Sequence, residues 1–158
     1  MTQERVEAEL DRLSKMDEVQ RQVLKVSQHV REEVLNCKCP RCGQVFVNFE
    51  GCFALKCSRC PCAFCGWCLC DSGSDDAHDH VRTCQHKPPG ADVFFGTEIQ
   101  FEQAVRNRRI RLLRAYFDEQ NFDLALKDKI MLELQPDFEA LELDNSGWYI
   151  SMVPVVGH

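Results

Sequence analysis

The chain has 158 residues and a formal net charge of −6, which suits one modest domain or a small module with helical flanks. The charge is spread unevenly: residues 1–36 sum to −2, 37–88 to +1, 89–134 to −1 and 135–158 to −4. A protein that binds nucleic acid by neutralising phosphates normally needs a basic face. Because no segment is strongly basic, nucleic acid is not an expected partner.

All eleven cysteines fall between Cys37 and Cys84. The first residues are charged, and no apolar run approaches the ~18 residues that span a membrane. We therefore expect an intracellular, cytoplasmic protein with no membrane segment. In a reducing compartment, clustered cysteines bind metal more often than they form disulfides, and an odd count argues against a fully paired disulfide framework.

Residues 1–36 are predicted to form an amphipathic helix. Apolar side chains recur there about every 3.5 residues without a Gly or Pro interruption, at Val6, Leu10, Leu13, Met16, Val19, Val23, Val26, Val30 and Val34. Such a stripe can pack within the chain or form a two-stranded coiled coil with a protein partner. Packing within the chain is favoured, because a valine-rich sequence makes a mediocre isolated helix.

Residues 37–88 carry four pairs of metal-ligand residues. Three C-x-x-C pairs and one H-x-x-x-C pair supply Cys39, Cys42, Cys57, Cys60, Cys65, Cys68, His80 and Cys84. Two residues between thiolates let both sulfurs reach one ion from a tight turn, and a tetrahedral zinc takes two such pairs. Eight ligands in so short a segment therefore predict two bound Zn²⁺ ions.

Some ligand positions stay open at this stage. His80 is favoured as the histidine ligand, with His78 next and His86 also nearby. Cys70 can replace a ligand of the second site. The pairs can be used in sequence, 39/42/57/60 and 65/68/80/84, or in an interleaved order.

A module of this size buries too little apolar surface to fold alone, so zinc should supply most of its folding free energy. A strand is expected over residues 45–49, and a mini-core is expected from Phe46, Phe49, Phe53, Leu55, Phe64 and Trp67. The predicted fold is a small zinc-stabilised α+β module, with short β-hairpins around two zinc ions, flanked by α-helices.

Residues 89–158 are predicted to be helical. Thr97 and Gln100 resemble a capping box that starts a helix running to about Phe117. Asp123 can cap a further helix that should stop before Pro136.

Five arginines lie between residues 106 and 114 of that region. They predict either a solvated helix face paired with nearby carboxylates or a docking surface for an acidic partner. The tail contains an apolar stretch at 147–150.

The central cysteines also resemble a known family. Cys39-Pro-Arg-Cys42, Gly51-Cys52, Cys57, Cys60, Phe64-Cys65 and Trp67-Cys68 are similar to the zinc domains of RING-between-RING ubiquitin ligases. In that family the in-between-RING (IBR) domain and the second RING share this layout. The resemblance covers 46 residues, from 39 to 84.

The resemblance implies a role for Cys52, which is not needed as a ligand. In the second RING of the family, a cysteine at this place accepts ubiquitin from a charged E2 as a thioester and passes it to a lysine. Cys52 would then be the catalytic nucleophile, with ubiquitin and a ubiquitin-charged E2 as partners. A thiol in this role must be partly ionised and reachable, and a hairpin tip after Gly51, beside a zinc site, would meet both conditions.

The sequence departs from the family pattern at three points. Ala54 stands where the family usually has a histidine base. The closing ligands run His then Cys, as in the in-between domain, and Cys37 fits that domain's first ligand in place of Cys39. In the alternative interpretation, Cys52 is a buried thiol and the chain is a non-catalytic, zinc-stapled protein-interaction module.

Overall fold

The computed structural model describes residues 3–45, 49–74 and 76–143. The predicted strand at 45–49, the side chain of Phe46 and the apolar stretch at 147–150 therefore lie wholly or partly outside the described residues. None of the helices in the described ranges combines the length and apolar character that crossing a bilayer requires.

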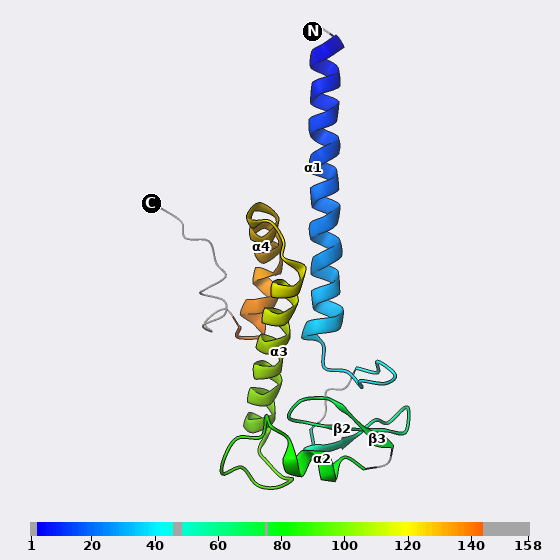
Figure 1. The fold of residues 1–158 in the computed structure, drawn as a ribbon, viewed down its shortest axis with the longest axis vertical. Helices are drawn as coiled ribbons and strands as arrows, with labels where there is room; N and C mark the ends of the chain where they lie inside the picture. The colour runs from blue at the N-terminus through cyan, green and yellow to red at the C-terminus, as the bar shows by residue number, and fades with distance from the viewer. Residues whose placement is uncertain (1–2, 46–48, 75, 144–158) are drawn as a thin grey trace. The chain divides into compact units, whose positions relative to one another are not determined.

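The chain divides into two compact units (Figure 1). The helical unit consists of Met1–Val34 and Leu113–His158, and the cysteine unit consists of Leu35–Leu112. Within the described residues the elements are α1 (Gln3–His29), η1 (Val30–Leu35), β1 (Ala54–Lys56), β2 (Cys62–Cys65), β3 (Asp71–Ser74), α2 (His78–Thr83), α3 (Glu98–Gln120) and α4 (Leu124–Ala140). The predicted small α+β fold with helical flanks is confirmed at this level.

In the helical unit, α1 and α4 pack side by side (Figure 1). Their core includes Val23 and Val26 from α1, Val30 from η1, and Ile130, Leu134 and Phe138 from α4. Arg31 fastens the pair, since its Nε lies 3.0 Å from the Asp137 carboxylate and its Nη2 donates to the Glu133 carbonyl. The C-terminal half of the predicted stripe therefore packs within the chain.

The predicted end of the last helix before Pro136 is wrong. Asp123 caps α4 as expected, accepting from the Leu126 N–H at 2.9 Å, but the helix continues through Pro136 to Ala140. A proline inside a helix costs about 3 kcal/mol. Continuing the helix places Phe138 in the core with no exposed surface, and burying a side chain of this size offsets much of that cost.

Replacing Val30 by Glu is expected to destabilise the helical unit by roughly 3–5 kcal/mol, because Val30 is fully buried and a carboxylate there would lose its hydration. The measurement is the midpoint of thermal unfolding followed at 222 nm. Leu132→Glu is the matched control, since Leu132 on α4 is 68% exposed. Equal midpoints for the two variants would show that the α1–α4 packing is wrong.

The cysteine unit contains a three-stranded antiparallel sheet in the order β1-β2-β3. β1 and β2 pair with Ala54 opposite Cys65 and Leu55 opposite Phe64. All four residues of the central strand β2 are buried. The loops that carry Cys57, Cys60 and Cys68 connect the strands of this sheet, so the sheet fixes where these loops begin and end.

Aromatic rings fill the core of this unit. Phe53 is completely buried and stacks on Trp67 with 3.7 Å between ring centroids. Phe49 stacks on Phe101 of α3 at 4.5 Å. Gly66 lies against this stack, because a Cβ there would fall 2.9 Å from the Phe53 ring. The mini-core predicted from the sequence thus includes a side chain from α3, beyond residue 88.

The start of α3 has the predicted capping box. The Gln100 N–H donates to the Thr97 hydroxyl at 3.1 Å, and the Thr97 N–H donates to the Gln100 side chain at 2.9 Å. Two arginines of α3 then bind backbone rather than carboxylates: Arg108 donates to the Cys68 carbonyl at 3.1 Å and Arg109 to the Leu35 carbonyl at 2.9 Å. Burial lowers the pKa of Arg108. These two side chains fasten α3 to the cysteine loops.

Candidate metal centres

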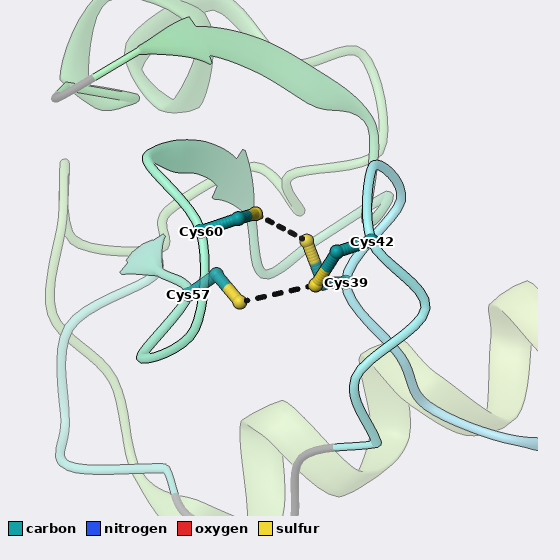
Figure 2. A group of neighbouring side chains, drawn as sticks. All are labelled: Cys39, Cys42, Cys57 and Cys60. Carbon is teal, nitrogen blue, oxygen red and sulfur yellow. Dashed lines mark hydrogen bonds between the residues drawn. The ribbon is translucent and has the colours of Figure 1, made fainter.

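Four cysteines form the first candidate metal centre (Figure 2). Their sulfur atoms, from Cys39, Cys42, Cys57 and Cys60, all lie within 4.8 Å of one another. The Cys39–Cys60 and Cys42–Cys57 sulfur pairs are each 3.6 Å apart. Zinc–sulfur bonds of about 2.3 Å in a tetrahedron place sulfurs about 3.8 Å apart, so the spacing matches the ion.

The second centre contains three cysteines and one histidine. Cys65, Cys68, His80 and Cys84 also place their ligand atoms within 4.8 Å of one another. The Cys68 sulfur lies 3.3 Å from Nε2 of His80. The short helix α2 carries His80 and ends just before Cys84, which explains how a three-residue spacer brings both side chains to one point.

Backbone N–H groups support the sulfurs in both centres. In the Cys57–Cys60 turn the Arg59 N–H donates to the Cys57 sulfur at 3.3 Å, and in the Cys65–Cys68 turn the Trp67 N–H donates to the Cys65 sulfur at 3.4 Å. Hydrogen bonds to sulfur favour its charged form. These two N–H groups are therefore placed to stabilise Cys57 and Cys65 as the thiolates that a metal ion requires.

The thiols of each centre differ strongly in acidity. Burial alone would raise the pKa of Cys39, but backbone hydrogen bonds from Cys42 and Arg41 lower it to about 6. At Cys60 a backbone hydrogen bond from Cys62 lowers the pKa, but burial and the neighbouring sulfurs outweigh it and raise the pKa to about 12.

The second centre shows the same division. A hydrogen bond from Cys65 is the largest of the contacts that lower the pKa of Cys68 to about 4. The hydrogen bond with Cys68, followed by burial, raises the pKa of Cys65. Because a metal ion binds thiolates, metal binding would release any protons that these sulfurs carry.

The remaining candidates from the sequence lie outside both centres. His78 pairs with the Asp76 carboxylate, and His86 lies beside the Gln85 side chain. Cys70 is exposed, with its sulfur next to the Asp71 carbonyl, and Cys37 lies 3.8 Å from Arg109. Of the two pairing orders left open, the structure has the sequential one.

One contact that stabilises the first centre was not predicted. Arg41, inside the Cys39–Cys42 turn, forms two hydrogen bonds to the Asp71 carboxylate of β3, at 3.0 and 3.1 Å. The hydrogen bonds from Arg41 are the first cause of an Asp71 pKa of about 2. Arg41 and Asp71 are 30 residues apart, so no local sequence signal could have paired them.

Cys52 belongs to neither centre. It is half-buried and forms an antiparallel bridge with Phe95. Two backbone hydrogen bonds flank this bridge, from Phe53 N–H to the Phe94 carbonyl at 2.7 Å and from Gly96 N–H to the Gly51 carbonyl at 2.9 Å. Cys52 therefore lies on a paired segment rather than at a free hairpin tip.

A cavity of about 580 Å³ opens beside Cys52. Glu50, Val45 and Lys56 also line it, together with Leu55 of the edge strand β1 and two ligands of the first centre, Cys39 and Cys57. Cys52 thus faces a cavity bordered by one acidic and one basic side chain.

The donor sets identify the chemistry that these centres can perform. Closed groups of four Cys, or of three Cys and one His, are the ligand sets of structural zinc, because they leave no open position for a substrate. All eleven cysteines are free of disulfides. Comparison with protein-family models, with curated proteins and with solved structures finds no match to this chain. Two Cys/His centres able to hold metal ions therefore define the chain as a candidate metal-binding module.

Proposed function

We propose that the chain is a module with two structural zinc ions that presents Cys52 for ubiquitin transfer, in the manner of the second RING of RING-between-RING ligases. The observation that carries the proposal is the position of Cys52: outside both centres, half-buried, and lining the cavity beside β1. Zinc, when bound, supplies folding free energy and holds the loops around this cavity.

The proposed chemistry consists of two acyl transfers. The Cys52 thiolate attacks the thioester carbonyl between ubiquitin and the E2, a new thioester forms, and the E2 cysteine leaves as a thiolate. A lysine amine then attacks the Cys52 thioester, an isopeptide bond forms, the amine releases its proton to solvent, and the Cys52 thiolate leaves. Neither step needs an oxidant or reductant.

The cavity bears on the first step because Lys56 lines it together with Cys52, which brings a basic side chain to the same cavity. Ala54 supplies no base, so the deprotonation of the attacking amine falls to solvent or to the acceptor protein.

A non-catalytic interaction module is the second candidate function. The observation that favours it is the antiparallel bridge between Cys52 and Phe95, because this pairing fixes the backbone of Cys52 within the fold. In that case Cys52 is a structural thiol and the exposed residues around the cavity only bind a partner. We propose a reducing, cytoplasmic location under either function, because clustered metal-binding cysteines are typical of reducing compartments.

Incubating the zinc-loaded chain with a panel of ubiquitin-charged E2 enzymes is expected to give a ubiquitin adduct that reductant removes. Cys52→Ser should convert it into an ester that resists reductant, and Cys52→Ala should abolish it. The readout is a denaturing gel run with and without reductant.

Cys70→Ala is the matched control, because Cys70 is an exposed thiol outside both centres. It should retain the full adduct. If Cys52→Ala retains the adduct, or if the wild-type chain forms none with any E2 while binding two zinc ions, the transfer proposal is wrong and the interaction module remains.

A further inference from the structure

Helix α1 carries two apolar stripes rather than the single one predicted from the sequence. The packed stripe consists of Val19, Val23 and Val26, continued by Val30 in η1, and it faces α4. The open stripe consists of Val6, Leu10, Leu13 and Leu24. At 100° per residue, the two stripes are centred roughly 130° apart around the helix.

The open stripe faces solvent over its whole length. Val6 is 40% exposed, Leu10 60%, Leu13 44% and Leu24 46%. Four large apolar side chains on one face of one helix exceed the scattered apolar residues of an ordinary surface. Among the described residues, α4 packs against the packed stripe and the four side chains of the open stripe stay exposed, so the open stripe offers a surface for another helix.

The spacing of the open stripe is that of a coiled-coil seam. Steps of four and three residues lead from Val6 to Leu10 and Leu13, and Leu24 follows after eleven residues, which is three further turns. Asp17 and Gln20 occupy the two seam positions between Leu13 and Leu24. The seam spans about 27 Å at 1.5 Å per residue.

Charge along α1 favours a second copy that runs in the opposite direction. Residues 3–11 carry four acidic and one basic side chain, net −3, and residues 12–25 carry four basic and two acidic side chains, net +2. A parallel pair would place like halves together and set the Asp17 carboxylates directly opposite each other. An antiparallel pair places unlike halves together and separates the two Asp17 side chains.

We propose that the open stripe of α1 is a homodimerisation surface, on which the α1 of a second copy packs as an antiparallel coiled coil. Centred near residue 15, this arrangement places Val6 beside Leu24 of the other copy. Glu7 and Arg21 flank the seam on the same side, two heptads apart, so each Glu7 lies beside the Arg21 of the other copy. The proposal is independent of Cys52 and of ubiquitin transfer.

Sedimentation velocity of the full zinc-loaded chain over a concentration series tests the surface. The wild-type chain should sediment as a monomer–dimer equilibrium, and Leu10→Glu with Leu13→Glu should make it monomeric at every concentration. Because both leucines are exposed, the thermal midpoint measured at low concentration should stay that of the wild-type monomer. Ile99→Glu, at a 66% exposed position of the cysteine unit, is the control and should dimerise as the wild type does.

Charge exchange tests the direction of the helices. Glu7→Lys alone should raise the dimer dissociation constant roughly tenfold, because two attractive pairs become repulsive. Arg21→Glu alone should do the same, and the two substitutions in one chain should restore the wild-type constant.

A wild-type chain that stays monomeric at high micromolar concentration overturns the proposal, whatever other protein binds α1. A dimer in which Leu10→Glu with Leu13→Glu has no effect also overturns it. The leucine substitutions could abolish the dimer while Glu7→Lys with Arg21→Glu fails to restore the wild-type dissociation constant. That result would reject the antiparallel arrangement.

Discussion

Removing the metal from the chain is expected to unfold the cysteine unit while the helices of the helical unit remain folded. Both metal centres lie in Leu35–Leu112, and neither includes a residue of the helical unit. A structural zinc contributes about 10–16 kcal/mol of binding free energy, which matches or exceeds the whole stability of a typical domain. The core of the helical unit contains no cysteine, so none of its packed side chains is a metal ligand.

Trp67 can report this unfolding. It is 3% exposed and stacks on Phe53, so its near-ultraviolet circular dichroism depends on the packed cysteine unit. The chain has two tryptophans, and Trp148→Phe leaves Trp67 as the single one. Chelation at mildly acidic pH should abolish the tryptophan band in the near-ultraviolet spectrum of this variant. The far-ultraviolet signal should fall only in part, because α1 and α4 persist.

Adding back Zn²⁺ should restore the Trp67 signal, whereas Mg²⁺ should not, because a thiolate site suits the softer ion. A Trp67 signal that survives complete metal removal would show that the aromatic core holds the cysteine unit without zinc. Loss of the whole helical signal would show that the helical unit does not fold without the cysteine unit.

Local patterns in the sequence predicted much of this structure. Ligand pairs with two or three residues between them predicted the eight residues that the structure brings together, because such spacing fixes the geometry of a turn on its own. The capping box at Thr97 and the cap at Asp123 were predictable for the same reason. Each of these features depends on four or five consecutive residues.

Contacts between distant segments could not be predicted in this way. The bridge between Cys52 and Phe95 joins residues 43 positions apart, and it replaces the free hairpin tip that the local sequence suggests. Pro136 predicts a helix end, yet α4 continues through it. The burial of Phe138 that favours this continuation is a tertiary effect, which the local sequence does not reveal. The sequence alone does not separate the two stripes of α1, because only the packing of α4 against α1 shows which apolar residues are buried.

Replacing one ligand of a centre is expected to lose one metal ion, whereas replacing the neighbouring non-ligand cysteine is not. Cys60→Ala removes a ligand of the first centre, and Cys62→Ala two residues later removes a buried thiol outside it. Cys68 and Cys70 offer the same comparison at the second centre. A centre with three remaining ligands has an open coordination position and binds zinc with much lower affinity.

Each ligand variant should therefore bind one ion fewer than the wild-type chain and lose part of the Trp67 signal. Cys62→Ala and Cys70→Ala should bind as many ions as the wild type. Loss of an ion from Cys70→Ala, with Cys68→Ala unaffected, would exchange the roles of these two cysteines and contradict the second centre described here.

The number of zinc ions bound to the wild-type chain tests the two-centre arrangement most directly. Native mass spectrometry of the full chain should show a mass excess of two zinc ions, and chelator at low pH should remove both. A folded chain that retains its Trp67 signal with no bound metal, or that saturates at a single ion, would contradict two four-ligand zinc centres.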